Sequence, residues 1–458
     1  MHLTEDAHLP GGQKLREDYY SSEAAGVWHG SAAEKLGLFG DVRAEDFRKL
    51  AEGYSPRGEA LVQNAGDPER RAAWDLTFSA PKDLSVIWAV GDEKTRHEIE
   101  RVHDRAVAET LRELEERFGL TRRGQGGHET EHGGMVFAVF RHGTSRDLDP
   151  QLHSHAVALN LVARSDGTWG TLETREIYSH QKVLGAIYRS HLAHGLARMG
   201  YQITREGESF GIAGVPRELR DEWSKARHRI EAEMARLGVT GAKAAEMANL
   251  ATRSKKNHDV TPEALRAGWA EHAREHGFGR DDVQKIRDSN SLAKLEKPDA
   301  KSELREATEH KAVLSEKELE YQSLVATVGH GREAARNFDL ELKREAVVLD
   351  SPEKNKKVVY STHEMVRTER DLMRMLDRGR NDQRHQLDEA QVHAAISRLQ
   401  AAKGFSLSDE QKKAVLHLTS TAGRDKVLVG DAGTGKSTSM EALREAYQSA
   451  GYKVIGLA

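Results

Sequence analysis

Two apolar runs joined by a polar segment, with three histidines placed along them, constrain this chain more than any other feature. The first run covers residues 135–140, and the second, residues 156–162, follows directly on a His-Xaa-His pair. Side chains at positions i and i+2 of a strand lie on the same face, so His153 and His155 can reach one ion. The polar segment before them is typical of a turn. The pattern therefore predicts a hairpin that brings His142, at the end of the first run, to the same ion.

Three neutral imidazoles suit a divalent metal ion that keeps open coordination positions, as a catalytic site requires. A chain with 23 histidines also produces a His-Xaa-His pair by chance, and it is the third histidine that favours a metal site. We expect Mg²⁺, Mn²⁺ or Zn²⁺ at His142, His153 and His155. Nitrogen ligands suit Zn²⁺, Mn²⁺ or Co²⁺ better than Mg²⁺, so the native ion stays open.

Composition excludes several classes of protein. No apolar run approaches the roughly 18 residues of a membrane span, and the N-terminus lacks the pattern of a signal peptide. The absence of cysteine excludes disulfides and thiolate ligands, and we expect a cytoplasmic protein without membrane insertion. The net charge of −4 does not indicate a nucleic-acid binder, so any phosphate contacts must come from local basic residues. The candidates are Arg141, Arg146, Lys82 and the cluster at 253–256.

The length of 458 residues predicts two or three domains. The first, residues 1–280, is expected to be α+β. In its expected strand at 74–81, alternation places Trp74, Leu76 and Phe78 on one face and Asp75 and Thr77 on the other. The other expected elements are helices over 93–117 and 180–199, a hairpin over 201–215, and helices that begin at Pro216 and Pro262.

Residues 281–312 are rich in Lys and Glu and contain no aromatic residue, a composition typical of a charged helical linker. Residues 313–400 are expected to form short helices that precede a second domain. Residues 401–458 are expected to begin that domain, with a helix capped by Ser408.

A phosphate-binding loop is predicted within residues 401–458. An expected buried strand at 427–429 leads into Gly430 to Ser437, which fits the G-x-x-x-x-G-K-[ST] pattern, and a helix is expected over 438–449. In such a loop the backbone amides cradle the phosphates of ATP, Lys436 neutralises them and Ser437 holds Mg²⁺. We expect a second strand over 453–458, followed by no acidic Walker-B strand, hence a truncated domain with at most weak nucleotide binding. The candidate nucleotide-binding residues are Gly430, Gly433, Thr434, Gly435, Lys436 and Ser437.

Several motifs together resemble the conjugative relaxases of the MobF (TrwC/TraI-like) type. These are residues 75–82 (Asp-Leu-Thr-Phe-Ser-Ala-Pro-Lys), the pair Tyr19-Tyr20, residues 33–38, and residues 149–156. The resemblance covers about residues 15–280. In that family a relaxase is fused to a superfamily 1 helicase, and Gln411 followed by the phosphate loop resembles the start of such a helicase. The resemblance makes Gln411 a further candidate nucleotide-binding residue.

The resemblance implies an HUH-type α+β relaxase domain, an antiparallel sheet with helices, followed by a truncated α/β P-loop NTPase domain. It implies that a tyrosine hydroxyl attacks a phosphate of single-stranded plasmid DNA at the nick site of a transfer origin, with Tyr19 as nucleophile and Tyr20 as its neighbour. Asp75 would orient a histidine or accept a proton, and the ion would stabilise the developing charge. Conjugation accessory and coupling proteins would be partners.

The sequence departs from the family at its start, because family members usually carry an earlier tyrosine pair where this chain has Pro10-Gly11-Gly12. A misplaced start codon and a decayed gene both account for this. An inactive or binding-only relic is therefore an alternative. A cupin-like oxidoreductase is a less favoured one, because residues 156–163 lack the glutamate ligand that it requires.

Overall fold

The structure, a computed structural model, divides into two units, Met1–Tyr360 and Ser361–Ala458. It describes residues 2–4, 25–124, 129–241, 244, 247–248, 261–289, 295–349, 358–431 and 433–457.

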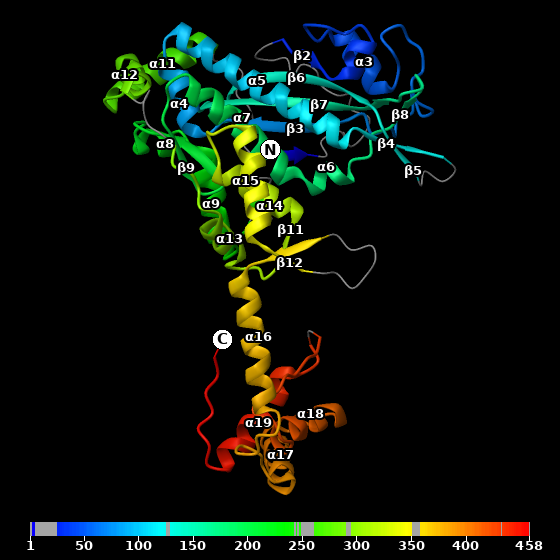
Figure 1. The fold of residues 1–458 in the computed structure, drawn as a ribbon, viewed down its shortest axis with the longest axis vertical. Helices are drawn as coiled ribbons and strands as arrows, with labels where there is room; N and C mark the ends of the chain where they lie inside the picture. The colour runs from blue at the N-terminus through cyan, green and yellow to red at the C-terminus, as the bar shows by residue number, and fades with distance from the viewer. Residues whose placement is uncertain are drawn as a thin grey trace. The chain divides into compact units, whose positions relative to one another are not determined.

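A twisted antiparallel sheet forms the centre of the first unit (Figure 1). Its strands lie in the order β1-β3-β7-β6-β2, and β8 pairs with β7 at one end. The expected histidine hairpin is formed by β6 and β7, and the strand expected at 74–81 is β3. The strands are β1 (His2–Thr4), β2 (Val27–His29), β3 (Ala73–Ser79), β6 (Gly134–Thr144), β7 (Pro150–Ala163) and β8 (Trp169–Gly170).

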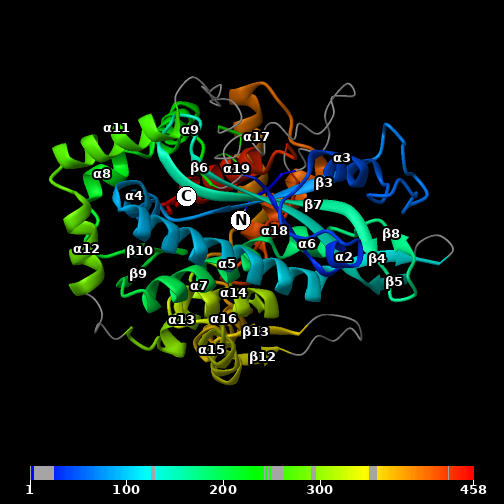
Figure 2. The ribbon, with the colours of Figure 1, turned by 90° about the horizontal axis from the view of Figure 1, so that it is seen from above.

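Helices bury both faces of this sheet (Figure 2). One face packs on α4 (Lys82–Val90), α5 (Glu93–Phe118) and α7 (Gln181–Arg198), and this layer holds the larger core. The other face packs on α2 (Ser31–Lys35) and α3 (Ala44–Glu52). The long helices expected over 93–117 and 180–199 are thus confirmed as α5 and α7. Among the polar positions of β3, Asp75 is buried under this cover, whereas Thr77 is half-buried and Ser79, the last residue of the strand, is exposed.

Smaller elements surround this layer. The hairpin expected over 201–215 is formed by β9 (Ile203–Glu206) and β10 (Ser209–Ile212). Pro262 is the first residue of its helix, and the hydroxyl of Thr261 accepts a hydrogen bond from the Ala264 amide at 3.3 Å. Pro216 instead caps its helix, which begins one residue later. The remaining elements are β4 (Leu120–Arg123), β5 (Glu129–His132), α6 (Arg175–Ser179), α8 (Arg217–Glu222), α9 (Lys225–Leu237), α11 (Pro262–Glu275) and α12 (Arg280–Ser289).

Residues 300–349 pack within the first unit, so the division between units lies at Tyr360 rather than in the expected linker at 281–312. The charged segment also contributes apolar side chains to the interior: Ala300 and Leu304 are buried in a small core together with Leu342. Arg332 also forms an ion pair with Glu113 of α5 at 2.6 Å. The elements are α13 (Ala300–Thr308), β11 (Leu314–Ser315), α14 (Glu316–Ala326), α15 (Arg332–Glu345), β12 (Val347–Leu349) and β13 (Val359–Ser361).

The second unit is helical in its described residues. It contains α16 (His363–Gly379), α17 (Glu389–Lys403), α18 (Asp409–Ser420) and α19 (Lys436–Ser449), and α17, α18 and α19 share a small core. No described helix in either unit is long and apolar enough to cross a membrane.

The strands expected at 427–429 and 453–458 are not formed in the residues described there, which is a correction to the sequence analysis. Val427 and Val429 are 81% and 88% exposed rather than buried. A strand needs a neighbour to satisfy its backbone groups, and none pairs with either segment in the described part of this unit.

Candidate metal centre

The register of β6 and β7 brings the three histidines together. His142 lies directly opposite His153, and residues opposite each other in an antiparallel pair project from the same face. His155, two residues further along β7, projects from that face as well. The expected i, i+2 geometry is therefore confirmed.

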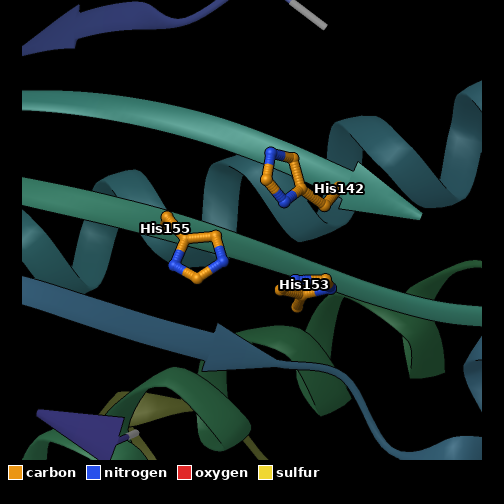
Figure 3. Close-up of side chains that lie close together, drawn as sticks. All are labelled: His142, His153 and His155. Carbon is orange, nitrogen blue, oxygen red and sulfur yellow. The ribbon is translucent and has the colours of Figure 1, made fainter. Parts of the chain in front are cut away.

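The three imidazole rings converge on one point (Figure 3). Their centroids are separated by 5.3 Å between His142 and His153 and by 5.1 Å for each of the other two pairs. One nitrogen from each ring lies within 4.8 Å of the other two. His142 and His155 are buried and His153 is half-buried, so His153 is the most accessible of the three rings.

Two of the rings are oriented through their Nδ1 atoms. Nδ1 of His155 donates to Oδ2 of Asp75 at 2.7 Å, and the hydroxyl of Thr77 lies 3.4 Å from the same nitrogen. Nδ1 of His153 donates to the backbone carbonyl of Gln151 at 2.8 Å. In this tautomer the lone pair of each ring is on Nε2, the arrangement that metal-binding histidines use. The donor set therefore fits a divalent ion of the zinc or manganese type.

A buried polar chain lies behind β7, and sequence analysis missed it. Ser154 projects to the opposite face from its histidine neighbours, where its hydroxyl contacts Nε2 of His103 at 2.8 Å. Nδ1 of His103 in turn lies 2.9 Å from the hydroxyl of Tyr188. Burial lowers the pKa of His103 to about 3, and burial raises that of Tyr188 well above its usual value. Both groups are neutral at physiological pH. The one sequence signal for this row of hydrogen-bonded side chains was the alternation of faces along β7, which directs Ser154 away from the histidines.

The turn between β6 and β7 is held by α9. Arg229 makes a bidentate ion pair with Asp147 at 2.7 and 2.8 Å, and Nζ of Lys225 lies 2.9 Å from Asp149. Nζ of Lys82 donates to the carbonyl of Pro150 at 2.9 Å. Burial lowers the pKa of this lysine to about 8.

Two of the candidate phosphate ligands, Lys82 and Arg141, instead contact other groups of the protein. Lys82 supports the turn that joins β6 to β7. Arg141 forms ion pairs with Glu100, at 3.2 Å, and Asp104, both on α5. Arg146 lies in the turn itself.

The expected nucleophiles, Tyr19 and Tyr20, lie outside the described residues, as does the basic cluster at 253–256. The structure brings together the three predicted metal ligands, His142, His153 and His155, and places Asp75, predicted as a catalytic residue, against His155.

The glycine-rich loop precedes α19, as its sequence predicts. Gly433 and Gly435 have positive φ angles of 82° and 78°, which explains why glycine is used at both positions. Gln411 caps α18 together with Ser408 and also donates from Nε2 to the carbonyl of Thr434 at 3.1 Å. It therefore joins α18 to the loop.

Lys436 and Ser437 form the first turn of α19, where a phosphate loop places them. Nζ of Lys436 donates to the carbonyls of Gly430 and Asp431, each at 2.6 Å. The lysine thus lies across the glycine-rich loop, in the position where it would contact a bound phosphate.

The fold and the site define a protein whose antiparallel sheet places three histidines close enough together to be able to hold one metal ion. Residues 4–276, more than half of the chain, match the TrwC relaxase family, and the chain belongs to that family. This membership argues against the cupin-like alternative. Residues 406–458 match a second family, described as an AAA domain.

The similar curated proteins act in conjugation by name. Multifunctional conjugation protein TraI of Escherichia coli is 34% identical over 288 residues, which are 60% of this chain but 16% of TraI. Conjugal transfer protein TraA of Rhizobium radiobacter is 37% identical over 117 residues, 26% of this chain and 10% of TraA. This chain therefore spans only a small part of the length of these relatives.

Solved structures of the conjugative relaxase TrwC share the fold. A metal-free complex of TrwC with oriT DNA aligns with a TM-score of 0.53 and 37% identity over 58% of this chain and 98% of that chain. A metal-bound complex aligns with a TM-score of 0.53 and 37% identity over 57% and 94%. A copper-bound complex aligns with a TM-score of 0.52 and 38% identity over 58% and 92%.

Proposed function

We propose that this chain is a conjugative relaxase, which cleaves one strand of plasmid DNA at a transfer origin and joins the new 5′ end to its own tyrosine. The observation that carries the proposal is the convergence of three histidine rings backed by Asp75, in a chain of the TrwC relaxase family. TrwC itself has been solved with oriT DNA in metal-bound form, which supports single-stranded DNA as the substrate here.

The histidines and Asp75 have different roles in the proposed metal site. The ion, when bound by His142, His153 and His155, supplies a Lewis acid that polarises the scissile phosphate. Asp75 keeps His155 in the tautomer that presents Nε2. The carboxylate thus acts as an orienting group for a ligand, the first of the two roles expected for it.

The proposed transfer step exchanges one phosphodiester bond for another. The phenolic oxygen of Tyr19 forms a bond to phosphorus as the bond from phosphorus to the 3′ oxygen breaks. The proton of the phenol is transferred to the departing oxygen, which leaves as a 3′-hydroxyl. The 5′-phosphotyrosine link preserves the energy of the broken bond, so the strand can be rejoined by the reverse reaction.

The test is a denaturant-stable adduct between the full chain and DNA. The purified protein is incubated with Mn²⁺ and with single-stranded oligonucleotides that tile the DNA flanking its coding sequence. We expect one oligonucleotide to give a shifted band in denaturing gels, and peptide mapping to place the modification on Tyr19. The Tyr19→Phe variant should lose the band, and the matched Tyr20→Phe variant should keep it.

The other outcomes are equally informative. If the band persists in Tyr19→Phe and disappears in Tyr20→Phe, the nucleophile is the neighbour and the mechanism stands. If an oligonucleotide binds in native gels but no tile gives an adduct, the enzyme proposal is wrong and the binding-only alternative holds.

We also propose that the glycine-rich loop binds ATP with Mg²⁺ as part of a helicase-type domain. Support comes from the AAA-domain match over residues 406–458 and from the position of Lys436 and Ser437 in the first turn of α19. Accessory and coupling proteins of conjugation would be the partners of the complete assembly. Equilibrium binding of a fluorescent ATP analogue tests the nucleotide site directly.

A further inference from the structure

A second group of metal-binding side chains lies where α8 meets α11. His272 and His276 are four residues apart near the end of α11 and therefore share one face of the helix. Glu222, the last residue of α8, places Oε2 at 2.8 Å from Nε2 of His272 and 3.2 Å from Nε2 of His276. One ligand atom from each of the three lies within 4.8 Å of the other two.

These spacings are close to those of an occupied site. Bonds of 2.0–2.2 Å in a tetrahedral zinc site place neighbouring ligand atoms about 3.3 Å apart. The two oxygen–nitrogen distances already lie near this value, so side-chain rotation alone would admit an ion. The side chains of Glu222, His272 and His276 are 49%, 38% and 25% exposed, which leaves room for water as a fourth ligand.

The backbone that carries the cluster is well anchored. Trp223, buried beside Glu222, packs against the ring of His272 with centroids 5.9 Å apart. Trp269, one turn before His272, packs against Trp88 at 6.1 Å. Rigid supports on both helices lower the entropic cost of assembling three ligands.

We propose that Glu222, His272 and His276 form a second divalent-cation site, distinct from the three-histidine centre. Two imidazoles and one carboxylate favour Zn²⁺ and related transition metals over Mg²⁺ or Ca²⁺, which prefer oxygen ligands. The ion would join α8 to α11 across residues 223–261. The proposal does not depend on relaxase activity.

The site would also support the catalytic hairpin. The indole nitrogen of Trp269 donates to the carbonyl of Leu148 at 2.9 Å. Leu148 lies in the turn between β6 and β7 and has a φ of 62°, the one positive value at a non-glycine position among the described residues. An ion that holds α11 in place would therefore hold this strained turn, which connects the strands that carry His142 and His153.

The experiment counts the zinc retained by the full chain after equilibrium dialysis, using the variants His272→Gln and His276→Gln. Glutamine can still donate a hydrogen bond to Glu222 but is a poor metal ligand, so each variant removes the ion while keeping the neighbouring contact. We expect each to bind one zinc fewer per chain than the wild type. The matched control is His97→Gln, at an exposed histidine on α5, which should bind as many as the wild type.

A second measurement isolates the site from the catalytic one. In a His155→Gln background, Zn²⁺ should still raise the thermal unfolding temperature, because an ion that binds only the folded state stabilises it. Adding His276→Gln should abolish that rise. If zinc content and thermal shift are unchanged in both His272→Gln and His276→Gln, the cluster is a hydrogen-bonded carboxylate between two histidines and the proposed site does not exist.

Discussion

Asp75 on β3 accepts a hydrogen bond of 2.7 Å from Nδ1 of His155 on β7, although 80 positions separate the two residues in the chain. Strand pairing creates this contact, because Asp75 lies opposite Val157, two residues beyond the histidine on the same face. The carboxylate of Asp75 therefore contacts one of the three candidate metal ligands and is not itself a candidate ligand.

Replacement of this carboxylate should weaken metal binding without abolishing it. We expect Asp75→Asn to lower the affinity for Zn²⁺ or Mn²⁺ by roughly 10- to 100-fold, because an amide holds the ring of His155 less strongly and leaves it less basic. Calorimetric titration of the full chain measures this. Asp281→Asn, at an exposed position on α12, is the control. Equal affinity in Asp75→Asn and the control would contradict the orienting role.

Removal of a ligand should have a larger effect than removal of its orienting partner. His153→Ala and His155→Ala each delete one of three metal–nitrogen bonds, so their affinities should fall below that of Asp75→Asn. The same titration applies, with His97→Ala as a control for loss of an exposed histidine. Wild-type affinity in His155→Ala would remove the three-histidine centre from the account.

The buried His103 should make folding sensitive to mild acid. In the folded protein the pKa of His103 is about 3, below the ordinary 6.5, chiefly because of burial. Between these two pH values the side chain is protonated in the unfolded chain but not in the folded one. Stability is therefore lost as pH falls below 6.5, by about 2 kcal/mol between pH 7 and pH 5. His103→Gln lacks this loss and retains a hydrogen-bonding side chain.

Urea unfolding at the two pH values tests this expectation. All six tryptophans lie between residues 28 and 269, so their fluorescence reports on the first unit alone. The wild type should lose about 2 kcal/mol more than His103→Gln between pH 7 and pH 5. Equal losses would show that His103 is protonated in the folded protein.

The ion pair between Arg332 and Glu113 should hold α15 against α5. Both side chains are 12% exposed, and removing the arginine leaves the largely buried carboxylate of Glu113 with His191, at 3.1 Å, as its one remaining ionisable partner among the described residues. We expect Arg332→Met to cost about 3 kcal/mol in tryptophan-monitored unfolding, and Arg336→Met, at an exposed position of the same helix, to cost less than about 0.5 kcal/mol. Equal stability of the two variants would show that α15 contributes little to the first unit.

Loss of the loop lysine should impair nucleotide binding. Lys436 lies across the glycine-rich loop, where its charge can offset that of bound phosphates. Lys436→Ala should weaken binding of a fluorescent ATP analogue at least tenfold, while Lys453→Ala, at an exposed position, should not. Indistinguishable binding by the two variants would contradict a phosphate-binding role for the loop.

Local patterns in the sequence predicted most of what depends on neighbouring residues. The alternation along β3 and β7 gave the facing of Asp75, His153 and His155 correctly, since strand periodicity is a local property. The cap at Ser408 was likewise predicted, because it needs only residues within one helical turn. The prediction of a strand at 427–429 was wrong because a strand also needs hydrogen bonds to a second strand, which local sequence patterns do not specify.

Only the tertiary structure decided which distant groups meet. Sequence spacing could place Asp75 on a polar face, but the pairing of β3 with β7 chose His155 as its partner. The same holds for His103 behind Ser154, and for Glu222 beside His272 on another helix. Periodicity specifies the face on which a side chain projects, whereas strand order and helix packing specify what lies opposite, and these arise from burial summed over the whole unit.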